Sequence, residues 1–193
     1  MPRLVVILGS VTPPGRMRRA LEGVCAARGS ISAGLEAELI DLAGQRIAFA
    51  DGRPPEALGD DTASIVARVG AADLVVLASP VYRASFSGAL KNLLDHLPLE
   101  ALCGKPVGIV AMGATPHHFL GVDSHLRDVL AWFGALVAPT SVYLCSGDFR
   151  EGALVESARS DLEDLVRTLV KLHAIRPAEG ESLGPRPLAA RRG

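Results

Sequence analysis

Residues 73–95 read DLVVLASPVYRASFSGALKNLLD, and the rest of the chain can be interpreted outward from this stretch. It starts with an almost unbroken aliphatic run, is interrupted at Ser79-Pro80, and resumes at helical spacing from Phe86. This pattern predicts a buried strand, a loop and a helix. Ligands of an open α/β sheet bind beyond the carboxyl ends of its strands, so we expect a ligand near residues 80–85.

The chain on either side alternates in the same way between short aliphatic runs and longer amphipathic segments. Further strands are expected at 4–8, 35–41, 106–112 and 136–144, the last interrupted by Pro139, and further helices at 17–28, 62–69, 119–133 and 153–173. Five strands alternating with five helices imply a parallel sheet covered on both faces. The sequence therefore predicts a single α/β domain over residues 1–175, with strand order 2-1-3-4-5, followed by a flexible tail at 176–193.

Composition excludes several classes of protein. The 193 residues include 20 Lys and Arg against 21 Asp and Glu, a net charge of −1 that argues against nucleic acid or an anionic membrane as partner. The first apolar run, residues 4–8, is too short for a signal peptide, and no run reaches the length of a membrane helix. Three widely spaced cysteines, Cys25, Cys103 and Cys145, suit a reducing cytoplasm.

The loop after the first strand has the chemistry of a phosphate site. Ser10 and Thr12 offer hydroxyl donors, and the following helix presents free N–H groups and the positive end of its dipole. Arg16 and Arg18 add cations that can form charge-assisted hydrogen bonds. Neither a Walker loop nor Gly-x-Gly-x-x-Gly is present, and a simple Gly/Pro turn with solvated arginines remains the alternative.

The loop after the third strand suits a flat heteroaromatic ligand. Pro80, Val81 and Tyr82 supply a rigid turn, an apolar contact and a ring, and Ser85 can hydrogen-bond ring heteroatoms. The segment Gly113 to Thr115, after the fourth strand, would close the other side of the ring. The simpler alternatives are a partly buried loop aromatic and an ordinary strand-to-helix turn.

Several motifs together resemble a known family. They are Leu8-Gly9-Ser10 with Arg16, the stretch 78–95 with its Ser-Pro-Val-Tyr and Ser-Gly-Ala-Leu-Lys elements, Gly113-Ala114-Thr115 with His118, and Val122-Asp123. These residues resemble the NADPH-dependent FMN reductases over roughly residues 3–175, and most of all the branch that serves two-component sulfonate monooxygenases.

The resemblance implies a flavodoxin-like three-layer α/β sandwich and hydride transfer from NADPH or NADH to FMN. It also implies a homodimer or homotetramer, and an FMNH2-dependent monooxygenase as partner. Ser10, Thr12, Arg16 and Arg18 would hold the FMN phosphate; Pro80, Val81, Tyr82, Arg83 and Ser85 would line the isoalloxazine; and Gly113 and Thr115 would lie beside its pyrimidine end. Some relatives carry a π-bulge in the helix after the fourth strand, where this chain has Ser124-His125.

We expect no catalytic side chain and no metal, because hydride transfer between two cofactors requires neither an acid–base pair nor a metal ion. His117-His118 are adjacent and cannot share one helix face, and no cluster of carboxylates or cysteines joins them in the sequence. One alternative is a reductase that retains FMN and reduces quinones, azo dyes or metal oxyanions. A flavodoxin-type electron carrier is the non-enzymatic alternative, but it needs a more acidic surface than a net charge of −1 provides.

Overall fold

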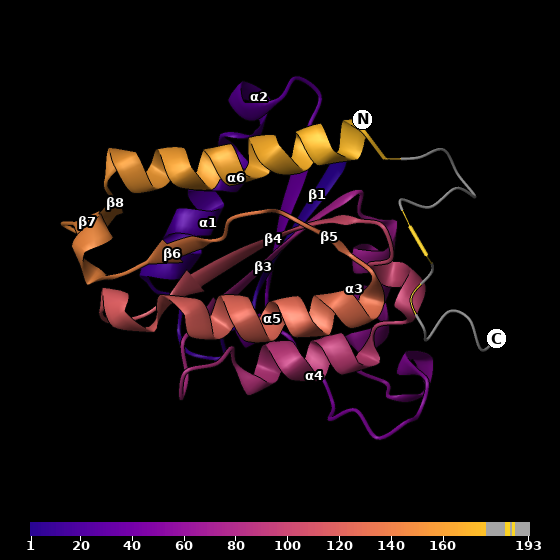
Figure 1. The fold of residues 1–193 in the computed structure, drawn as a ribbon. Coiled ribbons are helices and arrows are strands. Elements are labelled where there is room, and N and C mark those ends of the chain that lie inside the picture. The colour runs from indigo at the N-terminus through magenta and orange to yellow at the C-terminus, as the bar shows by residue number, and fades with distance from the viewer. Residues whose placement is uncertain (177–183, 186, 188–193) are drawn as a thin grey trace.

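In the computed structural model, the chain folds into one α/β sandwich (Figure 1). The description covers residues 1–176, 184, 185 and 187, without the side chains of His118 and Phe119. The strands are β1 Arg3–Leu8, β2 Glu36–Asp41, β3 Leu74–Pro80, β4 Pro106–Met112, β5 Leu136–Val137, β6 Val142–Leu144, β7 Phe149–Arg150 and β8 Ala153–Leu154. The α-helices are α1 Arg16–Ala26, α2 Arg28–Ile31, α3 Thr62–Ala71, α4 Gly88–His96, α5 Phe119–Phe133 and α6 Glu156–Ala174. Short 3-10 helices are η1 Leu42–Gly44, η2 Pro55–Ala57, η3 Leu99–Ala101, η4 Pro116–His118 and η5 Ser146–Asp148.

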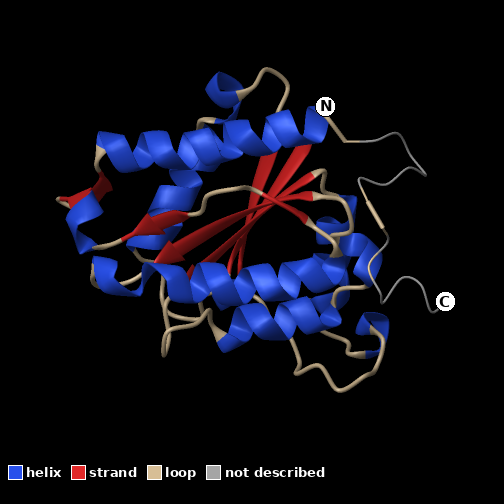
Figure 2. Cartoon of the chain, viewed as in Figure 1, coloured by secondary structure: helices blue, strands red, loops and turns tan. Residues whose placement is uncertain are grey.

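The main sheet is parallel with strand order β2-β1-β3-β4-β5, which confirms the predicted order (Figure 2). Its fifth position is divided between two short strands, because β5 and β6 both pair with β4. Pro139 lies in the gap between them, and a proline has no N–H to continue a ladder. The interruption that the sequence indicated is therefore a real break in the strand.

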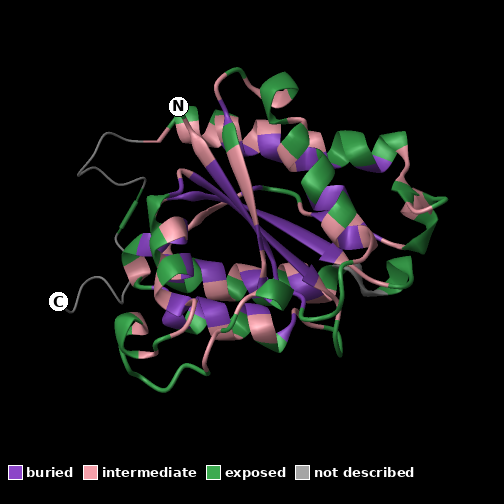
Figure 3. Ribbon diagram, turned by 180° about the vertical axis from the view of Figure 1, so that it is seen from behind, coloured by how far each residue is buried: buried purple, intermediate pink, exposed green. Residues whose placement is uncertain are grey.

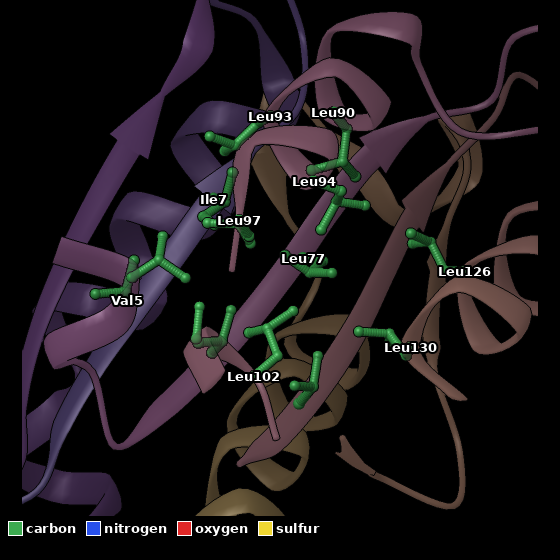
Figure 4. Packing of buried hydrophobic residues seen from close by; sticks show 14 of the residues in the cluster. Val5, Ile7, Leu77, Leu90, Leu93, Leu94, Leu97, Leu102, Leu126 and Leu130 are labelled. Carbon is green, nitrogen blue, oxygen red and sulfur yellow. The ribbon is translucent and has the colours of Figure 1, made fainter. Parts of the chain in front are cut away.

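Alternate residues of each central strand pack on opposite faces of the sheet, as the two-residue period of a strand requires. In β1, Leu4, Val6 and Leu8 face the layer of α1 and α6. Val5 and Ile7 face the layer of α3, α4 and α5, where they meet the leucines of α4 (Figure 4). Figure 3 shows the central strands β1, β3 and β4 buried between these two helical layers. These five side chains of β1 are at most 3% exposed, so helices pack against both faces of the strand.

The predicted helix boundaries hold for α5 and shift elsewhere. The helix expected at 17–28 divides into α1 and α2 around Ala27. The last helix begins at Glu156 rather than Ala153, because residues 149–154 form the antiparallel β7–β8 hairpin. Glu151 and Gly152, with φ of 50° and 80°, make its turn.

The tail predicted at 176–193 lies outside the described residues except for 176, 184, 185 and 187, so the domain limit at residue 175 stays a prediction. Of the helices that are described, none is long and apolar enough to cross a membrane.

Candidate functional site

The loops after β1, β3 and β4 meet at the carboxyl edge of the sheet, where the parallel strands all end. Backbone hydrogen bonds join them one to the next. Gly9 N donates to Ala78 O at 2.7 Å, and Val81 N donates to Met112 O at 2.8 Å. Gly113 N in turn donates to Leu144 O at 3.0 Å. The three segments predicted to bind one ligand are therefore neighbours in space.

Two buried serines fix the first of these loops to the start of α4. The Ser87 hydroxyl donates to Gly9 O and also caps α4 by accepting from Leu90 N at 3.0 Å. The backbone N–H of Ser87 donates to Ser79 Oγ at 2.9 Å. Gly9 lies so close to α4 that a Cβ at this position would be 2.6 Å from the Leu90 Cβ. Only glycine allows this close contact between the loop and the helix.

The part of the edge predicted to bind phosphate, called the phosphate end below, is a hydroxyl pair in front of an uncapped helix. Ser10 Oγ and Thr12 Oγ1 lie 2.8 Å apart, and Thr12 N donates to Ser10 Oγ at 3.3 Å. Among the described residues, no side chain caps α1 at Gly15, and its first turn has no acidic residue. The first N–H groups of α1 therefore lack an intrahelical acceptor and suit an anion.

The two arginines predicted for the phosphate are held differently. Arg16 Nη2 is 3.4 Å from Ser146 Oγ, and its guanidinium lies 5.1 Å from the centre of the Phe149 ring. Arg18 instead donates to Glu22 at 2.8 Å and to Asp41 at 3.0 Å, and these hydrogen bonds and charges, that of Glu22 first, raise its pKa. The Arg18 guanidinium is thus engaged by two carboxylates beside the end of β2, whereas Arg16 makes only weaker contacts.

The ring end is a tight turn over Tyr82 to Ser85. Tyr82 N and O both bond Ser85, at 2.8 and 3.0 Å. The two residues between them, Arg83 and Ala84, have φ of 50° and 62°, which is the left-handed conformation that a type I′ turn requires. Non-glycine residues adopt it at a cost of about 1–3 kcal/mol each, so the surrounding structure must hold the turn in place. Pro80 ends β3, and Tyr82 is 45% exposed.

The first half of α5 supplies that support. His125 Nδ1 lies 2.8 Å from Ser85 Oγ. At Gly121, an added Cβ would be 2.2 Å from Ala84 O, so the turn rests directly on the helix backbone. The helix is α-helical from Phe119 to Phe133, including Ser124 and His125, where a π-bulge was in question. The sequence pattern gives no signal for Gly121, and His125 was predicted only as a position of the possible π-bulge.

The third loop is held by Tyr143, a residue that sequence reasoning missed. Its hydroxyl donates to Thr115 O at 2.6 Å, and an added Cβ at Gly113 would lie 2.0 Å from the same hydroxyl oxygen. Partial burial, and then the nearby Cys145, raise the pKa of Tyr143. Its position at the end of the last strand was the available signal, because side chains at strand ends face the ligand edge.

These features define a flavodoxin-like fold whose ligand edge offers hydroxyl and amide donors beside an exposed aromatic ring. Comparisons with known proteins agree with this fold. The model of the family described as NADPH-dependent FMN reductase matches residues 2–149. The chain belongs to this family, and it is an oxidoreductase that uses FMN and NAD(P)H.

Similar proteins include an NAD(P)H-dependent FAD/FMN reductase of Geobacillus thermodenitrificans, 35% identical over 72% of this chain and 76% of the relative. The NADH-dependent FMN reductase SfnF of Pseudomonas putida is 30% identical over 81% of this chain and 84% of its own. An NADPH azoreductase of Bacillus sp. is 30% identical over 86% of this chain and 90% of its own length. Among solved structures, an oxidoreductase from Corynebacterium diphtheriae has a TM-score of 0.71 at 27% identity, covering 92% of this chain and 99% of its own.

The residues present fit FMN at both ends. The phosphate end offers the Ser10 and Thr12 hydroxyls, the unfilled amides of α1 and the Arg16 cation, which together match a phosphate dianion. The ring end offers the exposed Tyr82 and the amides of Ala114 and Thr115, which have no acceptor among the described residues. The Gly113 amide is already bonded to Leu144 O and is not part of this donor set.

Proposed function

We propose that this protein reduces FMN as a substrate and releases it to a partner monooxygenase, as in sulfonate desulfonation. The observation that carries the proposal is the open ring end. Tyr82 is 45% exposed, and Arg83 and Thr115 are also exposed, so little protein surface covers a bound ring. An enclosed pocket would bury most of its ligand and slow its release. The likeness to FMN reductases such as SfnF supports the same view.

In this proposal each end of the site has one task. Ser10, Thr12, Arg16 and the first amides of α1 bind the phosphate. Arg18 contributes long-range charge only, because Glu22 and Asp41 already accept from its guanidinium. The loop residues Pro80, Val81, Tyr82, Arg83 and Ser85 contact the ring, and residues 113–115 border its pyrimidine end.

Hydride transfer from reduced nicotinamide to the isoalloxazine is chemistry that the two cofactors supply when bound. The chain binds and orients them. The amides of Ala114 and Thr115 are suited to stabilise negative charge at the pyrimidine end, because preorganised N–H donors need no rearrangement as charge develops. Tyr143 keeps these amides in position through Thr115 O. No side chain is assigned a proton transfer.

The fate of FMN separates this proposal from its main alternative. The likeness to an NADPH azoreductase favours a reductase that retains FMN and reduces a second substrate. In the decisive experiment, a membrane permeable to FMN separates the protein, NADPH and FMN from a sulfonate monooxygenase and its substrate. Desulfonation across the membrane supports release. A yellow protein with one FMN per chain, and no product across the membrane, contradicts it.

We also propose that the protein assembles as a homodimer or homotetramer. The apolar face of α4 does not supply the contact, because Leu90, Leu93, Leu94 and Leu97 are all buried within a single chain. Exposed apolar side chains remain on neighbouring segments, namely Phe49 at 86%, Leu120 at 60% and Trp132 at 56% exposure. Light scattering of the purified protein measures its mass directly, and a monomer at micromolar concentration contradicts the proposal.

A further inference from the structure

A groove of about 610 Å³ lies beside the phosphate end, and the FMN site does not account for it. Its walls are α1, the β7–β8 hairpin and the first turns of α6. Figure 1 shows the hairpin at the end of the molecule where the strands of the sheet end. Arg16, the first residue of α1, lines the groove and directly follows the loop of residues 9–15. The groove therefore opens next to the position proposed for the FMN phosphate.

Arginines dominate the charge of the groove. Arg16, Arg19 and Arg159 line it, against Glu151 and Glu163. Glu163 is already paired with Arg167 at 2.7 Å. The Arg19 guanidinium has no hydrogen bond or ion pair within the described part of the chain, and Arg159 reaches Glu156 only at 3.6 Å, with 55% of its side chain exposed. Two arginines are thus available to an anion.

The floor between these arginines is apolar and open. Ala20 and Val24 of α1 and Leu154 of the hairpin line it. At Gly23, no described atom outside its chain neighbours and the backbone of α1 lies within 4 Å of the position that a Cβ would occupy. An apolar floor beside cations suits a base and a phosphate, and the volume is typical of sites for small organic ligands. The groove follows α1 from Arg16 to Ala27, the residue just after the helix, which is about 16 Å at 1.5 Å per residue.

We propose that this groove binds the adenosine end of NADPH, with the 2′-phosphate held by Arg19 and Arg159. The inference rests on the proposed function, and it adds the choice between NADPH and NADH. Arginine is the residue that accommodates a 2′-phosphate in dinucleotide sites, because its fork of donors matches phosphate oxygens. The adenine lies on the floor formed by Ala20, Gly23 and Leu154. The protein therefore prefers NADPH to NADH.

The test compares the two nucleotides in Arg19→Ala and Arg159→Ala. At saturating FMN, KM for NADPH rises about tenfold in each variant, the loss typical of one charge-assisted hydrogen bond, while KM for NADH stays within about twofold. KM for FMN, measured separately with varied FMN, also stays within about twofold. Arg28→Ala, which removes an exposed arginine outside the groove, is the matched control and changes neither nucleotide. Equal changes for NADPH and NADH, no change, or a wild-type preference for NADH would overturn the proposal.

A binding measurement tests the groove independently of FMN reduction. In calorimetry with the protein as purified, adenosine 2′,5′-bisphosphate binds at least about tenfold more tightly than 5′-AMP, and Arg19→Ala reduces this difference about tenfold. Equal binding of the two probes overturns the groove assignment even if FMN reduction is normal. Conversely, absence of FMN-dependent NAD(P)H oxidation in the wild type refutes the proposed function. The calorimetric comparison of the two probes then still tests whether the groove binds a 2′-phosphate.

Discussion

The phosphate end and the ring end of the site are held in opposite ways. At the ring end, the turn at Tyr82 to Ser85 adopts a costly backbone conformation and is supported by α5 through His125 and Gly121. At the phosphate end, the hydroxyls of Ser10 and Thr12 bond mainly each other, and α1 begins without a side-chain cap among the described residues. The ring end is built before the ligand arrives, whereas the phosphate end has donors that a ligand would satisfy.

The largest effect is expected where the ring end is most tightly packed. In Gly121→Ala, the new Cβ would lie 2.2 Å from Ala84 O, so the turn must move. A displacement of about 1 Å lowers kcat/KM for FMN reduction about 100-fold. Gly70→Ala is the matched control, because no described atom lies within 4 Å of its Cβ position in α3. The control keeps full activity and gains about 0.5–1 kcal/mol in stability. Full activity in Gly121→Ala would show that the turn does not need its support.

The next effect distinguishes the two arginines of the phosphate end. Arg16→Ala raises KM for FMN about tenfold, because a charged hydrogen-bond partner of the phosphate is lost. Arg18→Ala changes it by less than about threefold, since this guanidinium is engaged by Glu22 and Asp41. Steady-state kinetics with varied FMN gives both values. An unchanged KM in Arg16→Ala would contradict the phosphate assignment.

A smaller effect measures how α5 supports the turn. Ser85→Ala and His125→Ala each remove the 2.8 Å hydrogen bond and lower kcat/KM about fivefold, as expected for one partly exposed hydrogen bond. The double variant is no worse than Ser85→Ala alone, because the hydrogen bond to His125 is already lost in that variant. Fully additive losses in this double-mutant cycle would mean that the two side chains act separately.

The smallest effect should change stability and leave both ends of the site untouched. Lys105 is 5% exposed and donates to Val69 O and Gly70 O at the end of α3. Burial lowers the pKa of Lys105 to about 8 from 10.5. The unfolded chain therefore binds more protons than the folded chain between these two values, and stability rises with pH across that window. Denaturant unfolding at pH 8 and pH 9 should show a rise of about 1 kcal/mol that Lys105→Met lacks. The same rise in the variant would exclude Lys105 as its source.

The order of the strands and the topology of the sheet were easier to predict from the sequence than the side-chain contacts. The aliphatic runs of β1, β3 and β4 are buried on both faces, so their composition alone indicates a parallel sheet. The break at Pro139 was equally visible, because proline cannot continue a ladder. The β7–β8 hairpin was missed, because two-residue strands are too short to produce a periodic pattern.

Contacts between distant residues were the part of the site that the sequence could not predict. Arg18 lies in the predicted phosphate loop, yet one of its partners, Asp41, is at the end of β2. Tyr143 holds Thr115 across 28 residues of the chain. Such pairs depend on how strand ends meet in space, and residue type and local spacing do not contain that information. The placement of the loops was therefore predictable, but the partners of their side chains were not.

The exposure of Trp132 gives the protein a spectroscopic reporter. It is the single tryptophan of the chain, it lies on α5 at 56% exposure, and its ring packs edge-on against Phe133 at 5.0 Å. It lies thirteen residues after Phe119, about 20 Å along α5 from the end that adjoins the FMN loops. The wavelength of its fluorescence maximum therefore responds to water at that surface rather than to direct contact with flavin. A blue shift with rising protein concentration would follow subunit association, and quenching on addition of FMN would follow ligand binding through energy transfer.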